Sequence, residues 1–283
     1  MEVGQPYKLK IGAIIQARMN SQRLPQKVLL PLPYPDGKPI LGLIIDQLKK
    51  TQSIDQVIVA TTTHIADDPI ETFLKQYNIS CYRGDEQDVF SRFYDICQQE
   101  QLDLIIRLTA DNPVIDHRII EQTIAYHLAQ QQVYTRSTGW PLGMNIEVLS
   151  GQDLLAIESA ALSEYEKEHV TPYFRREHQI SNELAASIDP NLAKLRLTID
   201  YPADYAMFSI LLARMQKFEE KSPLAQIKKV LETTPWVFEI NRHLIQKKSF
   251  LNRDKELEEA VELLDKLDMS ESAEFLRQAV MKK

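Results

Sequence analysis

Residues 10–17 read KIGAIIQA, and the segment that follows, 18–27, reads RMNSQRLPQK. The first run is almost continuously apolar and rich in isoleucine, which is typical of a strand buried on both faces of a parallel sheet. Residues 40–50 then carry apolar side chains at the spacing of one helical face. A buried strand, a polar loop and an amphipathic helix, in that order, indicate the start of an α/β fold.

Strand and helix patterns keep alternating through the first half of the chain. Further strands are predicted at 56–61, 79–82 and 104–108, and further helices at 68–77, 87–101 and 118–130. This alternation is typical of a mostly parallel sheet with helices on both faces.

The pattern loosens after residue 132. Strands are predicted at 145–149 and 194–198, and helices at 153–161, 203–215 and 223–231. Beyond residue 247 the chain is charged and strongly helical, with an apolar stripe made by Leu257, Val261, Leu264 and Leu267. We predict one large domain over 8–247 and a helical appendage over 248–283, which docks on the core or on a second subunit, or stays a solvated tail.

Composition favours a soluble globular protein, with 44% hydrophobic and 26% charged residues. A formal net charge of −7 supplies no overall basic field for a nucleic acid backbone. Cys81 and Cys97 lack metal-ligand spacing and indicate two reduced thiols. No signal-peptide core precedes the first strand, and no apolar run approaches the roughly 20 residues of a spanning helix. We expect a cytoplasmic protein that binds neither nucleic acid nor membrane.

The loop after the first strand forms a local positive island. Arg18, Arg23 and Lys27 fall within ten positions, and no acid occurs between Glu2 and Asp36. Ligands of open α/β sheets bind outside the carboxyl ends of strands, and guanidinium and ammonium groups suit triphosphate oxygens. A solvated loop with ordinary surface charges is the alternative.

One six-residue pattern, LTxDxP, occurs twice, as LTADNP at 108–113 and LTIDYP at 197–202. Each copy places an aspartate, Asp111 or Asp200, just past a predicted strand and just before a helix. If the two strands are neighbours, both carboxylates enter one crevice and suit Mg²⁺, which prefers oxygen ligands. The alternative is helix capping by an acid that precedes proline.

An ordered series of motifs resembles the CMP-sugar synthetase superfamily of CMP-KDO and acylneuraminate cytidylyltransferases. The resemblance is greatest to the branch named after the spore-coat polysaccharide protein SpsF. It spans residues 10–247 and is carried by QARMNSQRLPQKVL at 16–29, VATT at 59–62, RGDEQDVFSR at 83–92, RLTADNPVID at 107–116, PLG at 141–143, EHVTPY at 168–173, LTID at 197–200 and NRH at 241–243.

The resemblance implies a nucleotide-diphospho-sugar transferase (GT-A/Rossmann-like) fold with a mixed, mostly parallel central sheet. It implies Mg²⁺ on Asp111 and Asp200, and a homodimer in which the segment from Glu147 to Tyr173 helps to build the acceptor pocket. The nucleotide-binding residues expected from it are Ala17, Arg18, Ser21, Arg23, Lys27, Thr61, Gly84 and Asp88. The expected acceptor-binding residues are Asn145, Glu147 and His169, together with Arg136 as a contact for an acceptor anion.

Two features depart from the family pattern. Gln26 stands where the family usually has glycine, and residues 134–138 differ from the usual Tyr-x-Ser-Asn of the branch. Outside the resemblance, the spacing of Asp88 and Arg92 on one predicted helix suggests only a modest surface pair.

We therefore predict a magnesium-dependent nucleotidyltransferase for surface polysaccharide synthesis, with Arg18, Lys27, Asp111 and Asp200 as catalytic residues. It would join a nucleoside monophosphate, from CTP by family default, to a sugar acid or sugar phosphate and release pyrophosphate. The alternatives are a guanylyltransferase of the same branch, a metal-dependent glycosyltransferase on the same scaffold, and a nucleotide-binding protein that has lost catalysis.

Overall fold

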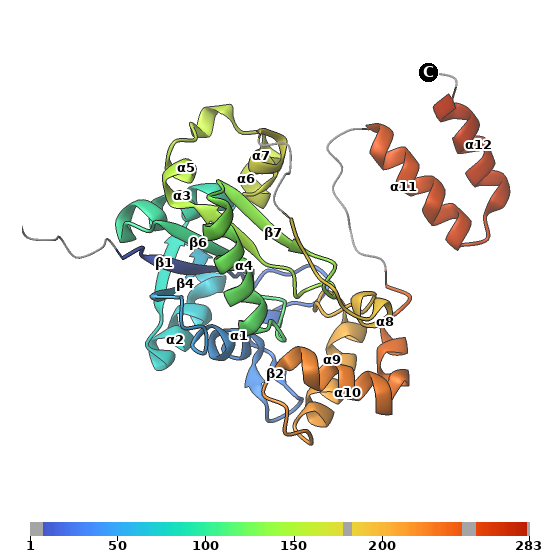
Figure 1. The fold of residues 1–283 in the computed structure, drawn as a ribbon, viewed down its shortest axis with the longest axis horizontal. Helices are drawn as coiled ribbons and strands as arrows, with labels where there is room; N and C mark the ends of the chain where they lie inside the picture. Colours follow the sequence, from blue (N-terminus) through green and yellow to red (C-terminus); the bar gives the residue numbers. More distant parts are fainter. Residues whose placement is uncertain (1–7, 178–182, 245–252, 282–283) are drawn as a thin grey trace, which may run out of the picture. The chain divides into compact units, whose positions relative to one another are not determined.

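The computed structural model describes residues 8–177, 183–244 and 253–281. Its centre is a seven-stranded sheet with the order β5-β4-β1-β6-β8-β7-β9 (Figure 1). Among these strands, β8 runs antiparallel to both of its neighbours, β6 and β7, whereas every other neighbouring pair is parallel. The predicted α/β fold with a mixed, mostly parallel sheet is confirmed.

The strands of the sheet are β1 (Ile11–Gln16), β4 (Gln56–Thr62), β5 (Ser80–Gly84), β6 (Leu104–Thr109), β7 (Tyr134–Thr138), β8 (Glu147–Ser150) and β9 (Glu183–Ala185). A small ribbon pairs β2 (Pro31–Leu32) with β3 (Lys38–Pro39). The helices packed around the sheet are α1 (Ile40–Leu48), α2 (Asp68–Tyr77), α3 (Val89–Glu100), α4 (His117–Gln130), α5 (Gly151–Leu155), α6 (Glu164–His169), α7 (Pro172–Glu177), α8 (Pro190–Ala193), α9 (Pro202–Met215) and α10 (Pro223–Thr233).

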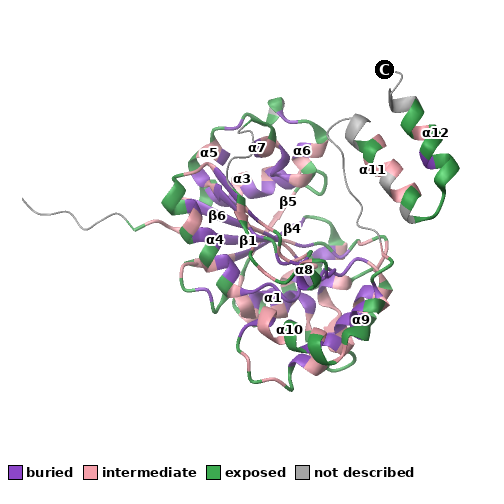
Figure 2. Ribbon diagram, turned by 45° about the vertical axis from the view of Figure 1, so that its right-hand side comes forward, coloured by how far each residue is buried: buried purple, intermediate pink, exposed green. Residues whose placement is uncertain are grey.

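Both faces of the sheet are covered, which explains the continuously apolar first strand. In β1, Ala13 and Ile15 face a core built with α1, α2, α4, α9 and α10, while Ile14 faces a second core built with α3, α5 and α7. Figure 2 shows the central strands β1 and β6 as mostly buried ribbon, while the outer surfaces of the helices are exposed. Because the cores on both faces of the sheet are apolar, the polar side chains lie at the ends of the strands.

Two predicted elements of the second half are wrong. Residues 194–198 form no strand of the sheet; within them, Arg196 makes an isolated bridge to Leu142. The predicted helix 153–161 is instead the short α5, which starts earlier because Ser150 caps it, and a separate 3-10 turn at Ser159–Ala161. The segments β7, β9, α6 and α7 were not predicted, because they are short and lack a clear apolar period.

The chain divides into two compact units, one up to Arg242 and one from His243 onward. The described part of the second unit consists of α11 (Arg253–Lys266) and α12 (Ser270–Met281), which contact each other. The predicted boundary at 247/248 lies outside the described residues. The helical character of the appendage is confirmed, while its docking stays a prediction. None of the described helices is long and apolar enough to cross a membrane.

Candidate active site

The predicted nucleotide loop continues directly from the carboxyl end of β1. Ala17 extends the sheet by one residue, since its nitrogen donates to the carbonyl oxygen of Ala60 at 3.0 Å. The neighbouring strands β4, β5 and β6 end at the same edge with Thr62, Gly84 and Thr109. This is the edge at which open α/β sheets bind their ligands.

Asp67 fixes the first turn of this loop. Its Oδ1 accepts from the nitrogen of Met19 at 2.7 Å, and its Oδ2 accepts from the hydroxyl of Thr62 at 2.5 Å. The side chain is buried, and it ties the loop after β1 to the end of β4. Sequence reasoning missed Asp67, because an acid just ahead of a helix start carries no signal beyond capping.

Gln26 has a left-handed backbone, with φ 60° and ψ 15°, at the position where the family usually has glycine. A side chain in this region costs about 1–2 kcal/mol relative to the right-handed one. The turn is retained because the nitrogen of Gln26 donates to Met19 O and its own carbonyl oxygen accepts from Leu29 N. This turn places Lys27 as the first residue of a short 3-10 helix.

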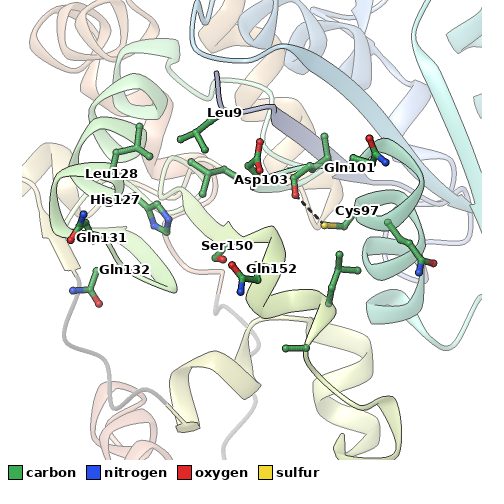
Figure 3. Close-up of a pocket in the computed structure, with 15 residues that line it drawn as sticks. Leu9, Cys97, Gln101, Asp103, His127, Leu128, Gln131, Gln132, Ser150 and Gln152 are labelled. Carbon is green, nitrogen blue, oxygen red and sulfur yellow. Dashed lines mark hydrogen bonds between the residues drawn. The ribbon is translucent and has the colours of Figure 1, made fainter. Parts of the chain in front are cut away.

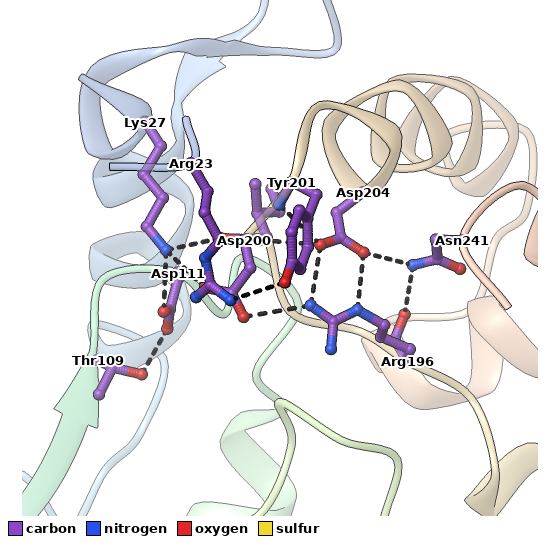
Figure 4. Close-up of polar contacts among 10 residues, drawn as sticks. Arg23, Lys27, Thr109, Asp111, Arg196, Asp200, Tyr201, Asp204 and Asn241 are labelled. Atoms are coloured by element: carbon purple, nitrogen blue, oxygen red, sulfur yellow. Dashed lines mark hydrogen bonds and ion pairs between the residues drawn. The ribbon is translucent and has the colours of Figure 1, made fainter. Parts of the chain in front are cut away.

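The ammonium of Lys27 lies among three oxygen atoms (Figure 4). Its Nζ is 3.1 Å from Asp111 Oδ2, 3.2 Å from Asp200 Oδ1 and 2.7 Å from the carbonyl oxygen of Ile199. The two predicted aspartates therefore converge on one point, from opposite halves of the sequence, and they do so against a cation of the basic loop.

The second LTxDxP copy reaches this point without belonging to the sheet. It crosses the strand ends, where the nitrogen of Ile199 donates to the carbonyl oxygen of Asp111 at 2.9 Å. Gly143, at φ 98°, lets it pass, because a Cβ there would lie 2.1 Å from Leu197 O. The expectation that Asp200 ends a strand is wrong, although the expected meeting of the carboxylates is found.

Three cations hold the carboxylate of Asp200. Arg23 donates to Oδ1 at 2.9 Å, Lys27 contacts the same oxygen, and Arg196 contacts Oδ2 at 3.2 Å. The guanidinium of Arg23 also lies over the ring of Tyr201, 4.6 Å from its centroid. Asp200 is thereby fixed in position, as a metal-binding or phosphate-facing carboxylate needs to be.

Behind Asp200, the buried Asp204 organises the turn. It accepts from Arg196 Nε and from the nitrogens of Asp200 and Tyr201 at 2.9 to 3.0 Å, and from Asn241 Nδ2 at 2.8 Å. Burial alone raises the pKa of Asp204, but these donors, Arg196 first, outweigh it and hold the pKa below its usual value. Asn241, whose role the sequence left open, supports this turn.

The oxygen atoms around Lys27 also fit a magnesium ion. Two carboxylates from Asp111 and Asp200 are of the type and number that Mg²⁺ takes from proteins when phosphate and water complete its shell. Over the described ranges no group of three or more His, Cys, Asp and Glu side chains could hold a metal. Asp111 is oriented by the hydroxyl of Thr109, which donates to its Oδ1 at 2.6 Å.

The other residues predicted to bind the nucleotide are spread along the same edge. Ser21 lies half-exposed in the basic loop, Thr61 is buried at the end of β4, and Gly84 ends β5. Asp88 caps α3, with its Oδ1 accepting from Ser91 N at 2.8 Å. The surface pair suggested for Asp88 and Arg92 is wrong, because Arg92 is buried and no ion pair joins the two described side chains.

Two of the predicted acceptor residues, Glu147 and His169, lie near each other on the α6 side of the sheet. Glu147 accepts from Arg107 at 2.7 Å and from the hydroxyl of Tyr134 at 2.6 Å. Burial raises its pKa, but Arg107 and Arg175 outweigh this and keep the pKa of Glu147 low. Burial, with Arg107 and Arg175 nearby, lowers the pKa of His169, on which Glu147 acts in the opposite direction.

Of the remaining two predicted acceptor residues, Arg136 is the register partner of Glu147 on the neighbouring strand β7, and Asn145 lies two residues before Glu147 in the chain. Arg136 is engaged by Glu183, its register partner on β9, and its Nε donates to Glu183 at 2.8 Å. Asn145 is exposed and donates to the carbonyl oxygen of Trp140 at 3.3 Å. A role for Arg136 and Asn145 in acceptor binding stays a prediction.

A depression of about 980 Å³ lies at the other end of the strands, away from this site (Figure 3). Leu9, Asp103 and Ser150 line it, together with the buried His127 and Cys97. His127 is 3.0 Å from the hydroxyl of Thr135, and burial lowers its pKa to about 4. The residues predicted for the nucleotide, the metal and the acceptor do not line this depression.

Comparisons with known proteins agree with this geometry. A family model described as "Cytidylyltransferase" matches residues 12–266. The spore coat polysaccharide biosynthesis protein SpsF of Bacillus subtilis (strain 168) is 33% identical over 199 residues, which cover 68% of this chain and 82% of SpsF. Protein MJ1063 of Methanocaldococcus jannaschii is 32% identical over 243 residues, covering 84% of this chain and 97% of that protein.

Among solved structures, a cytidylyltransferase from Leptospira borgpetersenii superposes with a TM-score of 0.72 at 28% identity. The match covers 85% of this chain and 100% of the Leptospira chain. The predicted resemblance to the superfamily and to the SpsF branch is confirmed.

Proposed function

The chain belongs to the cytidylyltransferase family, and from that premise we propose that it transfers CMP from CTP to a sugar acid or a sugar phosphate. The products are an activated nucleotide-sugar and pyrophosphate. The name of its relative SpsF, a spore coat polysaccharide biosynthesis protein, supports a place in surface polysaccharide synthesis.

The observation that carries this proposal is the ammonium of Lys27 between Asp111 and Asp200. Three cations, Arg23, Lys27 and Arg196, match three carboxylates there, the third being Asp204. Because the three cations and three carboxylates neutralise one another, a triphosphate that enters this site needs a divalent cation to offset its negative charge. Lys27 then exchanges its carboxylate partners for phosphate oxygens.

In the proposed reaction an acceptor oxygen attacks the α-phosphorus of CTP, a new P–O bond forms, and the bond to pyrophosphate breaks. Asp111 and Asp200 would hold Mg²⁺, which when bound supplies positive charge to the phosphate oxygens. Arg18, Arg23 and Lys27 stabilise the charge that builds on pyrophosphate. Removal of one such cation costs about 3 kcal/mol of transition-state stabilisation, or on the order of a hundredfold in rate.

Acceptor binding is proposed on the side of the sheet where Glu147 and His169 lie. A buried carboxylate that Arg107 and Tyr134 hold in place suits hydrogen bonds from a polyol. A homodimer that completes this pocket and a cytoplasmic location are further parts of the proposal. The homodimer derives from the family resemblance, and the location from Cys81 and Cys97, which indicate reduced thiols.

A pyrophosphate-release screen tests the proposal, with four nucleoside triphosphates against sugar acids and sugar phosphates in the presence of Mg²⁺. We expect release from CTP with one class of acceptor, and loss of release in Asp111→Asn. Release from GTP instead indicates a guanylyltransferase. Sugar transfer from a nucleotide-sugar, without pyrophosphate, indicates a glycosyltransferase.

A further inference from the structure

Arg92 lies in the first turn of α3 and is only 3% exposed. Its Nε is buried without a hydrogen-bond partner, and none of the described side chains forms an ion pair with it. Burying a guanidinium without partners is unfavourable, so such a group is retained when a ligand or a function uses it.

A second guanidinium, that of Arg18, lies nearby. Arg18 is exposed at the start of the basic loop, and within the described ranges it forms no ion pair. Burial first, and then the charge of Arg18, lowers the pKa of Arg92, and the nearby Asp67, Asp85 and Asp88 only partly oppose this. All three carboxylates accept from main-chain nitrogens: Asp67 from Met19 of the basic loop, and Asp85 and Asp88 from residues two or three positions further along their own turn.

The other cations of the crevice differ from this pair. Lys27 and Arg23 are already matched by Asp111 and Asp200. Among the cations of this crevice in the described part of the chain, Arg18 and Arg92 are therefore the two whose positive charge is available to a ligand.

Gly84 shows that the chain makes room for Arg92. A Cβ at Gly84 would lie 2.7 Å from the Cγ of Arg92 and 3.0 Å from the ring of Tyr82. The end of β5 thus lets the stem of Arg92 pass close to its backbone, so that the guanidinium is held near the strand ends.

The position of Arg18 and Arg92 along the sheet indicates that they bind the nucleotide and not the acceptor. Gly84, the loop of Arg18 and the first turn of α3 gather at the ends of β5, β4 and β1, whereas the acceptor residue Glu147 lies on β8, beyond β6. Two guanidinium groups on the same side of the sheet match a phosphate with more than one charge better than a single carboxylate.

We propose that Arg92 and Arg18 form an anion site that holds a phosphate group of the nucleotide. This inference rests on the proposed function and adds Arg92 as a nucleotide-binding residue that composition and motif spacing did not reveal. According to this proposal, Arg92 contributes to ligand binding and not to the stability of the unliganded protein.

Inorganic pyrophosphate is the first probe, titrated into the full chain and into Arg92→Met, which keeps an unbranched side chain in place of the aliphatic stem but removes the charge. We expect the dissociation constant for pyrophosphate to rise by about tenfold or more, while the melting temperature of the unliganded variant stays equal or rises. A fall in melting temperature with unchanged pyrophosphate binding would overturn the inference, because Arg92 would then be structural.

Arg83→Met is the matched control, since Arg83 lies on the same strand end but is paired with Asp68 and Glu71. We expect it to lower the melting temperature and to leave pyrophosphate binding unchanged. If Arg92→Met does not fold, Gly84→Ala displaces the Arg92 stem with the charge retained, and it must weaken pyrophosphate binding for the inference to stand.

Steady-state kinetics then show whether Arg92 binds the nucleotide or the acceptor. We expect Arg92→Met to raise KM for CTP about tenfold and to leave KM for the acceptor unchanged. A rise confined to the acceptor KM overturns the assignment to the nucleotide. Absence of turnover in the wild-type chain refutes the proposed function alone, because the pyrophosphate titration still decides whether Arg92 binds an anion.

Discussion

The main-chain nitrogen of Ile199 donates to the carbonyl oxygen of Asp111 at 2.9 Å, and this bond joins the two copies of the LTxDxP motif. It places the residue before Asp200 against Asp111, the second residue after the end of β6. Both carboxylates therefore reach Lys27, although one copy follows a sheet strand and the other crosses the sheet edge. Five predictions follow from this arrangement and from the buried groups around it.

Asp111→Asn and Asp200→Asn should separate catalysis from stability. Each substitution removes a carboxylate charge, so we expect turnover to fall on the order of a hundredfold or more in both. Asp200 balances three cations and is buried, so its loss should also cost about 2–4 kcal/mol of unfolding free energy, whereas Asp111→Asn should cost about 1 kcal/mol. Urea unfolding and pyrophosphate release measure the two effects. Retained turnover in Asp111→Asn would favour capping as its role.

Lys27→Met should change the response to magnesium. Without the ammonium, Asp111 loses its ion-pair partner and Asp200 keeps only Arg23 and Arg196, so the unliganded protein should lose about 1–3 kcal/mol of stability. Millimolar Mg²⁺ should then raise the melting temperature of the variant more than that of the wild type, because the ion no longer competes with Lys27. Equal responses of both proteins would contradict a shared cation position.

Gln26→Gly should stabilise the protein by about 1 kcal/mol, since glycine adopts a φ of 60° without steric cost. Gln101→Gly is the matched control, because Gln101 has a φ of 53° at the end of α3, away from the basic loop. We expect both variants to gain similar stability in thermal unfolding. A different KM for CTP should appear only in Gln26→Gly.

Gly143→Ala should displace the segment that carries Asp200. The added Cβ would lie 2.1 Å from the carbonyl oxygen of Leu197, so the crossing segment must move. We expect a loss of about 2–4 kcal/mol in unfolding free energy and a larger relative loss of turnover. Gly139→Ala, with φ 76° but no atom nearer than 3.5 Å, serves as the control for backbone strain alone. Equal effects of the two variants would argue against a special role for Gly143.

His127 should make stability depend on pH between about 4 and 6.5. Burial lowers its pKa from 6.5 to about 4, so the unfolded chain binds a proton in this range that the folded chain does not. Stability is therefore full above pH 6.5 and falls as the pH decreases, by about 3 kcal/mol in total. His127→Gln should flatten this slope, most clearly between pH 6.5 and 5, where few carboxylates titrate. Urea unfolding at several pH values measures it, and an unchanged slope would show that His127 protonates without unfolding.

Local patterns predicted the first half of the fold well. The helix at 68–77 agrees with α2 in both bounds, and the strand at 56–61 agrees with β4 to within one residue. The strand buries a continuous run of apolar residues and the helix buries one regular apolar face, so the spacing of apolar residues predicts both elements. Residues 134–138 carry mostly polar side chains and become a strand only because β8 and β9 pair with them.

For the candidate site, the residue types and their order along the chain were sufficient to nominate Lys27, Asp111 and Asp200, because phosphate and metal chemistry demand these groups. Their meeting depends on long-range contacts that no local period encodes: the bond from Ile199 to Asp111, the passage beside Gly143 and the support from Asp204. Arg92 shows the same limit. Its spacing from Asp88 suggested a surface pair, and only burial under the strand ends, which depends on the packing of α3 against β5, turned it into an unpaired cation.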